Sequence, residues 1–254
     1  MVKVKMFEGI QRAPQPAQQL PPMDREAFYE VVESRRSVRI FAEDAVPAEV
    51  VVRCIEAAQK APNSSNLQCW EVYQVVTSTL KEKLVHACLG QPAASTAPEL
   101  FVFVARPDLW RRNNAWTLEA LERRGDAPDR AFQYFRKITR IAYTQGAFAW
   151  VKRIWFFIRG IGKATPREPV GWSDMRVWAH KSTALAASHF MLAMRAEGFD
   201  TCPMEGMDSH RVKRLLGLPR RAEVNMVISA GRRTEKGVYG PRVRFPLDTF
   251  FKKA

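Results

Sequence analysis

Hydrophobic residues recur along most of the chain at intervals of three or four positions, the spacing of one face of an α-helix. This pattern predicts a first helix over residues 25–34, with Asp24 as its N-cap. It predicts a second helix that begins at Pro47 and ends before the Pro/Asn/Ser-rich segment 61–66. Later helices of the same kind are predicted over residues 78–89, about 174–197 with Ser173 as N-cap, and 209–216.

Three shorter segments have a different pattern, in which β-branched and aromatic residues follow one another with few interruptions. They cover residues 69–76, 99–105 and 223–231. This composition predicts strands, and the uninterrupted run ELFVFVA at 99–105 predicts a strand buried on both faces. Helices and strands alternate irregularly, so we predict an α+β fold around a small sheet.

The chain is predicted to be organised around one domain. Residues 1–23 are rich in Pro and Gln, lack the apolar centre of a signal peptide, and are predicted to form an extended arm. Residues 24–254 are predicted to be a single domain with a basic, partly helical insertion at about 106–170. We expect no membrane-spanning helix and a location in the cytoplasm.

Charge narrows the candidate partners. Lys and Arg number 40 and Asp and Glu 26, a net charge of +14, which favours polyanions or phosphorylated small molecules. The insertion 106–170 alone holds 14 basic and 6 acidic residues. The four cysteines lie far apart without metal-ligand spacing, so we expect free thiols and no metal site.

The common sequence motifs of catalysis are absent. No GxGxxG follows a predicted strand, and no P-loop, GxSxG or HExxH occurs. What stands out is SRRSVRIF at 34–41, where Arg35, Ser37 and Arg39 alternate and would share one side of an extended chain. Two guanidinium groups and a hydroxyl suit a phosphate. In the same extended chain Arg36 and Val38 point away, and a solvated basic helix end is the alternative interpretation.

Two further segments join this pattern. PNSSN at 62–66 places hydroxyl and amide groups before a predicted strand, and PRVRFPLD at 241–248 again alternates two arginines. Together with RRSVR, and in this order, they resemble the nitroreductase family of FMN-dependent oxidoreductases. The resemblance covers residues 34–76, 200–208 and 240–248, and with the connecting helices about three-quarters of the chain.

The resemblance implies a small mixed or antiparallel sheet flanked by helices, in an intertwined homodimer with FMN at the interface. One set of residues is implied to hold the phosphate and the ribityl–pyrimidine side: Arg35, Arg36, Ser37 and Arg39, with Arg242 and Arg244. A second set is implied to approach the flavin from the other subunit: Pro62, Asn63, Ser64, Ser65 and Asn66, with Gln68 nearby. A third set is implied to contact the ring: Gln91 at its edge, and Met204, Glu205 and Gly206, whose backbone N–H reaches N5. The chain departs from the family pattern at Asn63 and Cys69, where serine and proline are common.

The same resemblance implies an activity without a catalytic nucleophile. NADH or NADPH gives hydride to FMN and leaves, and a small acceptor such as a nitroaromatic or a quinone then takes it, in a ping-pong mechanism. A cation near the ring, with Arg39 the best candidate, and the Glu205/Gly206 backbone would tune it. Flavin cleavage, dehalogenation and azoline oxidation remain alternatives within the family.

The segment FAWVKRIWFFIRGIGK at 148–163 predicts an amphipathic helix. Its apolar face holds Trp150, Ile154, Phe157, Ile158 and Ile161, and its basic face Lys152, Arg159 and Lys163. Three interpretations remain open: packing on the core over the flavin cleft, peripheral contact with a membrane surface, and a partner protein. A nucleic-acid partner is not expected, because zinc spacing, a helix-turn-helix signature and an RNP motif are all missing.

Overall fold

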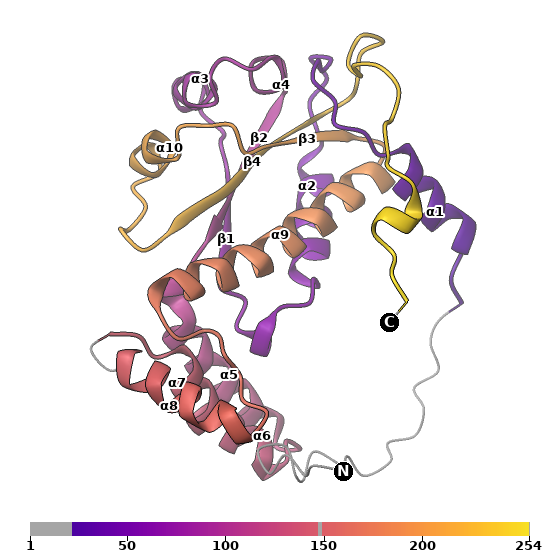
Figure 1. The fold of residues 1–254 in the computed structure, drawn as a ribbon. Coiled ribbons are helices and arrows are strands. Elements are labelled where there is room, and N and C mark those ends of the chain that lie inside the picture. The colour runs from indigo at the N-terminus through magenta and orange to yellow at the C-terminus, as the bar shows by residue number, and fades with distance from the viewer. Residues whose placement is uncertain (1–21, 147–148, 254) are drawn as a thin grey trace.

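A four-stranded antiparallel sheet forms the centre of the fold in the computed structural model, which describes residues 22–146 and 149–253 (Figure 1). The strands are β1 (Trp70–Gln74), β2 (Glu99–Ala105), β3 (Asp200–Met204) and β4 (Glu223–Gly231), in the order β1-β2-β4-β3. Every neighbouring pair is antiparallel, so the predicted small sheet is confirmed.

Helices cover both faces of this sheet. On one face lie α2 (Ala48–Gln59) and the long α9 (Trp172–Ala196). On the other lie α3 (Ser78–Ala87), α4 (Pro92–Ser95) and α10 (Ser209–Leu215). Helix α1 (Arg25–Ser34) lies beside the end of α9, and the C-terminal segment, with the short turn Leu247–Thr249, runs past α1 (Figure 1).

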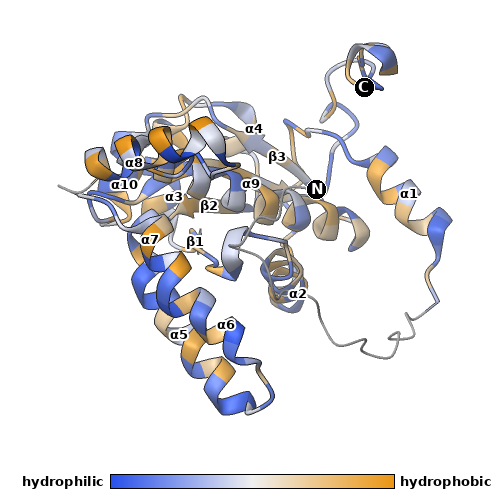
Figure 2. Cartoon of the chain, turned by 60° about the horizontal axis from the view of Figure 1, so that its bottom comes forward, coloured by the Kyte–Doolittle hydropathy of each residue, from blue (hydrophilic) through white to orange (hydrophobic). Residues whose placement is uncertain are grey.

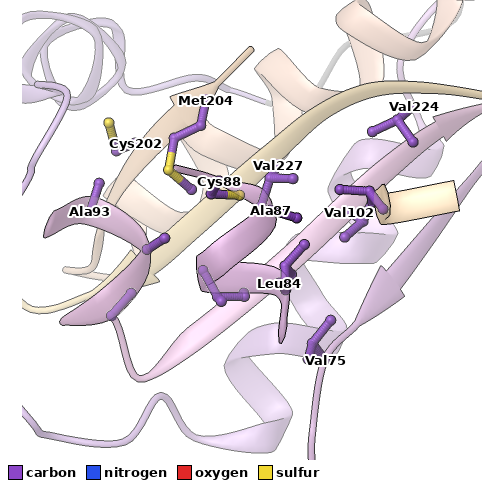
Figure 3. Packing of buried hydrophobic residues seen from close by; sticks show 14 of the residues in the cluster. Val75, Leu84, Ala87, Cys88, Ala93, Val102, Cys202, Met204, Val224 and Val227 are labelled. Carbon is purple, nitrogen blue, oxygen red and sulfur yellow. The ribbon is translucent and has the colours of Figure 1, made fainter. Parts of the chain in front are cut away.

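The sequence of strand β2 is almost entirely apolar because both of its faces are buried. Phe101 and Phe103 point to the α9 side, where their ring centroids lie 4.9 and 5.4 Å from that of Phe190. Val102 and its neighbours point to the opposite side, into a cluster that contains Leu84 (Figure 3). Both faces of the strand are therefore buried, as the uninterrupted run predicted.

The insertion folds into a group of helices at the end of the molecule away from α1 (Figure 1). Its elements are Pro107–Leu109, α5 (Trp110–Arg124), α6 (Asp129–Gln133), a π-turn at Tyr134–Ile138, α7 (Thr139–Tyr143) and α8 (Ala149–Gly162). A small cluster of Leu67, Cys69, Trp110, Tyr143 and Met175 joins it to the rest of the fold.

Two expectations need correction. The start of α9 is not capped by Ser173: the helix begins at Trp172, and the Asp174 carboxylate accepts the N–H groups of Val170 and Gly171 at 2.8 and 2.9 Å. Strand β3 was not predicted, because Pro203 lies inside it and proline is unusual in a strand. Most of the predicted N-terminal arm, residues 1–21, lies outside the described residues.

Candidate functional site

A basic cavity of about 140 Å³ lies between the segment that follows α1 and the C-terminal segment. Its lining includes five arginines and one serine, namely Arg35, Arg36, Ser37, Arg39, Arg242 and Arg244. The remaining lining residues are Val238, Tyr239, Pro241 and Val243, so the lining has no carboxylate. Two segments that are about two hundred positions apart in the sequence thus form one site, and its donors suit a phosphate group.

Backbone pairing with β3 fixes the direction of residues 35–39. The Val38 N–H donates to the Thr201 carbonyl at 3.1 Å, and the Arg39 N–H donates to the Gly237 carbonyl at 2.7 Å. Val38 is fully buried, while Ser37 and Arg39 line the cavity. The expected alternation therefore holds at Ser37, Val38 and Arg39.

Arg36 departs from that alternation. Its side chain was expected to point away from the site, yet it lines the cavity and donates to the Gly240 carbonyl at 2.8 Å. The reason is that the C-terminal segment passes the side of residues 35–39 to which Arg36 points. The Arg36 guanidinium therefore meets the backbone of residue 240.

The C-terminal arginines make different contacts. The Arg242 guanidinium donates to the backbone carbonyls of Glu33 and Arg35 at 2.5 and 2.6 Å, at the C-terminal end of α1. It satisfies carbonyls that a helix end leaves without partners. Among the described residues Arg244 donates only to the neighbouring Val243 carbonyl, so its charge remains available to a ligand.

Arg35 has an unfavourable environment for a cation. Burial, together with the charges of Arg242, Arg244 and Arg36, lowers its pKa below the ordinary value of arginine. Within the described residues the Arg35 guanidinium has no hydrogen-bond acceptor or ion-pair partner. An anion in the cavity would relieve this repulsion and supply the missing acceptors.

A buried carboxylate, that of Asp200, holds two arginines that contact Ser34, the residue just before the basic cluster. Asp200, at the start of β3, is 3% exposed and pairs with both Arg195 and Arg233. Arg195 Nε donates to the Ser34 hydroxyl at 2.9 Å, and Arg233 Nη2 donates to the Ser34 carbonyl at 3.3 Å. Sequence reasoning missed this arrangement, because its residues come from four segments of the chain, most of them far apart in the sequence.

Gln91 and the segment after β3 form a second group. Gln91 Nε2 donates to the Gly206 carbonyl at 2.7 Å, and Met204 ends the strand with its side chain buried. No hydrogen bond from the N–H of Glu205 or Gly206 is found within the described residues. Because Ser37 pairs with Thr201 and Met204 lies three residues further along β3, this group is about 10 Å from the basic cavity along the strand.

The loop at residues 62–66 makes its contacts elsewhere. The Ser65 hydroxyl lies 2.7 Å from that of Tyr134 and 2.8 Å from that of Tyr143, and Ser64 also contacts Tyr143. Asn63 Oδ1 accepts the Gln68 N–H at 2.8 Å. Ser65, Asn66 and Gln68 have positive φ angles of 56°, 51° and 47°, a conformation that non-glycine residues adopt at a cost.

Strand register separates this loop from the basic cavity. The loop leads into Trp70, which pairs with Ala105, itself opposite Glu223 at the start of β4. The cavity lies beyond Gly231 at the other end of β4, opposite Asp200. Eight steps of ~3.3 Å along β4 put about 26 Å between the two ends. One chain therefore does not bring residues 62–66 to its own basic cavity.

Several known proteins are similar to this chain over most of its length. The family model described as Nitroreductase family matches residues 32–232. The chain is 27% identical over 214 residues to an NADH dehydrogenase of Thermus thermophilus, covering 84% of this chain and 89% of that protein. It is 26% identical over 224 residues to MhqN of Bacillus subtilis, named as an NAD(P)H nitroreductase, covering 88% of this chain and 97% of that protein.

A solved structure shares the fold. It is a protein of Exiguobacterium sibiricum, classed as a nitroreductase and determined in complex with FMN. The TM-score is 0.67 at 20% identity, covering 93% of this chain and 100% of that one. The match of the family model over most of the chain, on a fold of this kind, leads to one conclusion: the chain belongs to the nitroreductase family.

Proposed function

We propose that this protein is an FMN-dependent oxidoreductase that takes hydride from NADH or NADPH and passes it to a small organic acceptor, such as a nitroaromatic or a quinone. The observation that carries the proposal is the basic cavity between residues 35–39 and 242–244. Its five guanidinium groups, its hydroxyl and its lack of carboxylates fit the phosphate of FMN. When bound, FMN supplies the ring that accepts and releases hydride.

The residues of the cavity have different roles in binding the phosphate. Arg35 and Arg244 are the principal charges: within the described residues Arg35 has no acceptor, and Arg244 donates to the carbonyl of the adjacent Val243 alone. Ser37 adds a hydroxyl donor next to them. Arg242 acts indirectly: it fastens the C-terminal segment to the end of α1 and so keeps Arg244 in place.

Two groups are proposed to act on the ring. Arg39 lies with its guanidinium carbon 5.2 Å from the centroid of Tyr239 and supplies a cation that stabilises negative charge developing on the ring. The N–H groups of Glu205 and Gly206 supply donors on the open side of the edge strand β3. Gln91 holds the Gly206 carbonyl and thereby orients these donors.

The site is proposed to be completed by a second copy of the chain. The loop 62–66 is about 26 Å along the sheet from the basic cavity of its own chain, so it serves the cavity of the partner. This arrangement supports an intertwined homodimer with FMN at its interface. The three positive φ angles are consistent with a loop of fixed conformation that forms one side of the partner's FMN site.

The mechanism we propose is ping-pong. One cleft serves both the nucleotide and the acceptor, and no protein nucleophile is required. Initial-rate plots at several fixed acceptor concentrations are expected to give parallel lines, whereas intersecting lines would rule this mechanism out.

The test uses protein purified with added FMN. Anaerobic addition of NADH or NADPH in a stopped-flow instrument is expected to bleach the flavin absorbance, and subsequent mixing with a nitroaromatic or a quinone is expected to restore it. The variant Arg35→Ala/Arg244→Ala is expected to lack the flavin band, while Arg124→Ala, on the exposed side of α5, keeps it. If flavin binds but neither nucleotide bleaches it, the oxidoreductase proposal fails.

A further inference from the structure

Helix α8 exposes the face that the sequence pattern marks as apolar. Trp150, Phe157 and Ile161 are 66%, 65% and 77% exposed, and Ile154 and Ile158 are also exposed. Phe156 is the only buried residue of α8. The expectation that this face packs on the core of its own chain is therefore wrong.

Two cations of the predicted basic face, Lys152 and Arg159, are partly buried instead, whereas Lys163 is exposed just beyond the end of the helix. The Lys152 ammonium donates to the Ala142 carbonyl of α7, and the Arg167 guanidinium donates to the carbonyls of Phe156 and Gly160 at 3.3 and 3.2 Å. Arg159 is partly buried as well, with its Nε unpaired within the described residues. The helix is thus attached through cations and carbonyls, and its apolar residues on the other side are left exposed. Figure 2 shows that α8 carries strongly hydrophobic residues among hydrophilic ones.

The surroundings of this face are cationic. Residues 130–167 include nine Lys and Arg and no Asp or Glu. Arg140, Arg153 and Lys163 are exposed and form no ion pair within the described residues. An aromatic and aliphatic face bordered by unpaired cations is the composition of helices that lie in the interface of anionic membranes.

We propose that α8 binds the surface of a bilayer that contains anionic phospholipid. Trp150, Ile154, Phe157 and Ile161 enter the boundary between headgroups and acyl chains, and Arg153 and Lys163 contact lipid phosphates. The helix lies in the plane of the interface: its 14 residues extend about 21 Å, short of the roughly 30 Å hydrocarbon core. In the described part of the chain no helix is long and apolar enough to cross a membrane.

Charge distinguishes a bilayer from the other occupants of such a face. A second copy would bring an equally cationic segment on a chain of net charge +14, and contact between the two segments would be repulsive. A nucleic acid would engage the cations and leave the aromatic face in water. Anionic lipid satisfies both the apolar residues and the cations.

The test is vesicle co-sedimentation of the full chain with its flavin bound. Vesicles of phosphatidylcholine with phosphatidylglycerol are compared with vesicles of phosphatidylcholine alone. The protein is expected to sediment with the anionic vesicles and to remain in solution with the neutral ones. Equal partitioning into both, or into neither, would overturn the proposal.

Matched variants assign the contact to α8. Ile161→Ser and Val76→Ser each alter one side chain that is 77% exposed, the second of them on the loop after β1. Ile161→Ser combined with Phe157→Ser is expected to weaken vesicle binding about tenfold, and Val76→Ser to leave it unchanged. Arg153→Ala/Lys163→Ala is expected to weaken it as well. If the α8 variants keep full vesicle binding, or if they instead change the oligomeric state measured by light scattering, the proposal is wrong.

Discussion

The guanidinium of Arg242 donates a hydrogen bond of 2.6 Å to the backbone carbonyl of Arg35, and so joins the C-terminal segment to the residue that begins the basic cluster. Its second bond, to the Glu33 carbonyl, makes the same side chain a cap for the end of α1. The cavity thus depends on a contact between two arginines in which one supplies the donor and the other only its backbone.

This contact predicts different effects for the two C-terminal arginines. Arg242→Ala should loosen the segment that follows residue 240, because it removes two hydrogen bonds from a charged donor, worth about 1.5 kcal/mol or more. Chymotrypsin should then cut at the exposed Phe245, Phe250 and Phe251 about tenfold faster. Arg244→Ala, which loses only a bond to its neighbour, should leave the cleavage rate unchanged. Equal rates in the two variants would contradict the assigned role of Arg242.

The distance between the loop 62–66 and the basic cavity predicts complementation between two defective chains. Arg35→Ala/Arg244→Ala removes phosphate donors, and Asn63→Ala/Ser65→Ala removes the hydrogen bonds that hold the loop. A heterodimer purified through two different tags pairs the intact cavity of one chain with the intact loop of the other. It should retain about one FMN in two chains, while each homodimeric variant retains little. If the heterodimer retains no more FMN than either homodimeric variant, the whole site lies within one chain.

A buried ion pair at the start of the insertion predicts a large loss of stability. Arg106 pairs with Glu71 and Asp108, and its side chain is only 10% exposed. Arg106→Ala should lower the free energy of unfolding by about 3 kcal/mol, because two carboxylates lose their counter-charge in a poorly hydrated place.

Arg124 provides the control for this measurement. It forms the same fork with Asp126 at i+2, but its side chain is 67% exposed. Arg124→Ala should change the free energy of unfolding by less than about 1 kcal/mol. Urea denaturation curves of the two variants check the difference, and similar losses would contradict the burial argument.

The inward position of Lys152 predicts a dependence of stability on pH. Burial lowers its pKa to about 8, with Asp174 acting in the opposite direction. Between pH 8 and the ordinary value of 10.5 the unfolded chain holds more protons on this lysine than the folded chain does. The stability of the wild type should therefore rise with pH in this window relative to Lys152→Met.

Urea denaturation at pH 7.5 and pH 10 measures that difference, since other titrating groups contribute equally to the wild type and the variant. A constant difference for Lys152→Met would mean that its ammonium is hydrated after all.

Elements with a strong local pattern could be predicted from the sequence. Strands β2 and β4 occupy the predicted residues because their apolar runs are buried on both faces, and α1 begins after Asp24, whose carboxylate accepts the Ala27 N–H at 3.0 Å. Strand β3 was missed because Pro203 is unusual inside a strand. Its position at the edge of the sheet explains why proline is tolerated there.

The candidate site was predictable where its residues are close in sequence. The RRSVR pattern identified four of the residues that line the cavity, but the side on which Arg36 lies depends on the distant residue 240. Asp200 pairs with Arg195 and Arg233, and both arginines contact Ser34. These contacts join residues of four segments, so no local pattern predicts them. The helical wheel of α8 grouped Lys152 and Arg159, which are both partly buried, but it could not tell that the apolar face is the exposed one. It also placed Lys163 on the basic face, whereas Lys163 is exposed beyond the end of the helix.

The central claim is that the basic cavity holds the phosphate of FMN, and the most direct test compares FMN with riboflavin, which lacks the phosphate. Titration by fluorescence quenching should show that the wild type binds FMN about a hundredfold more tightly, as expected from about 3 kcal/mol of charge-assisted hydrogen bonds. In Arg35→Ala/Arg244→Ala the two affinities should become nearly equal, with riboflavin affinity unchanged, while Arg124→Ala keeps the full preference. A double variant that still prefers FMN a hundredfold would contradict the account.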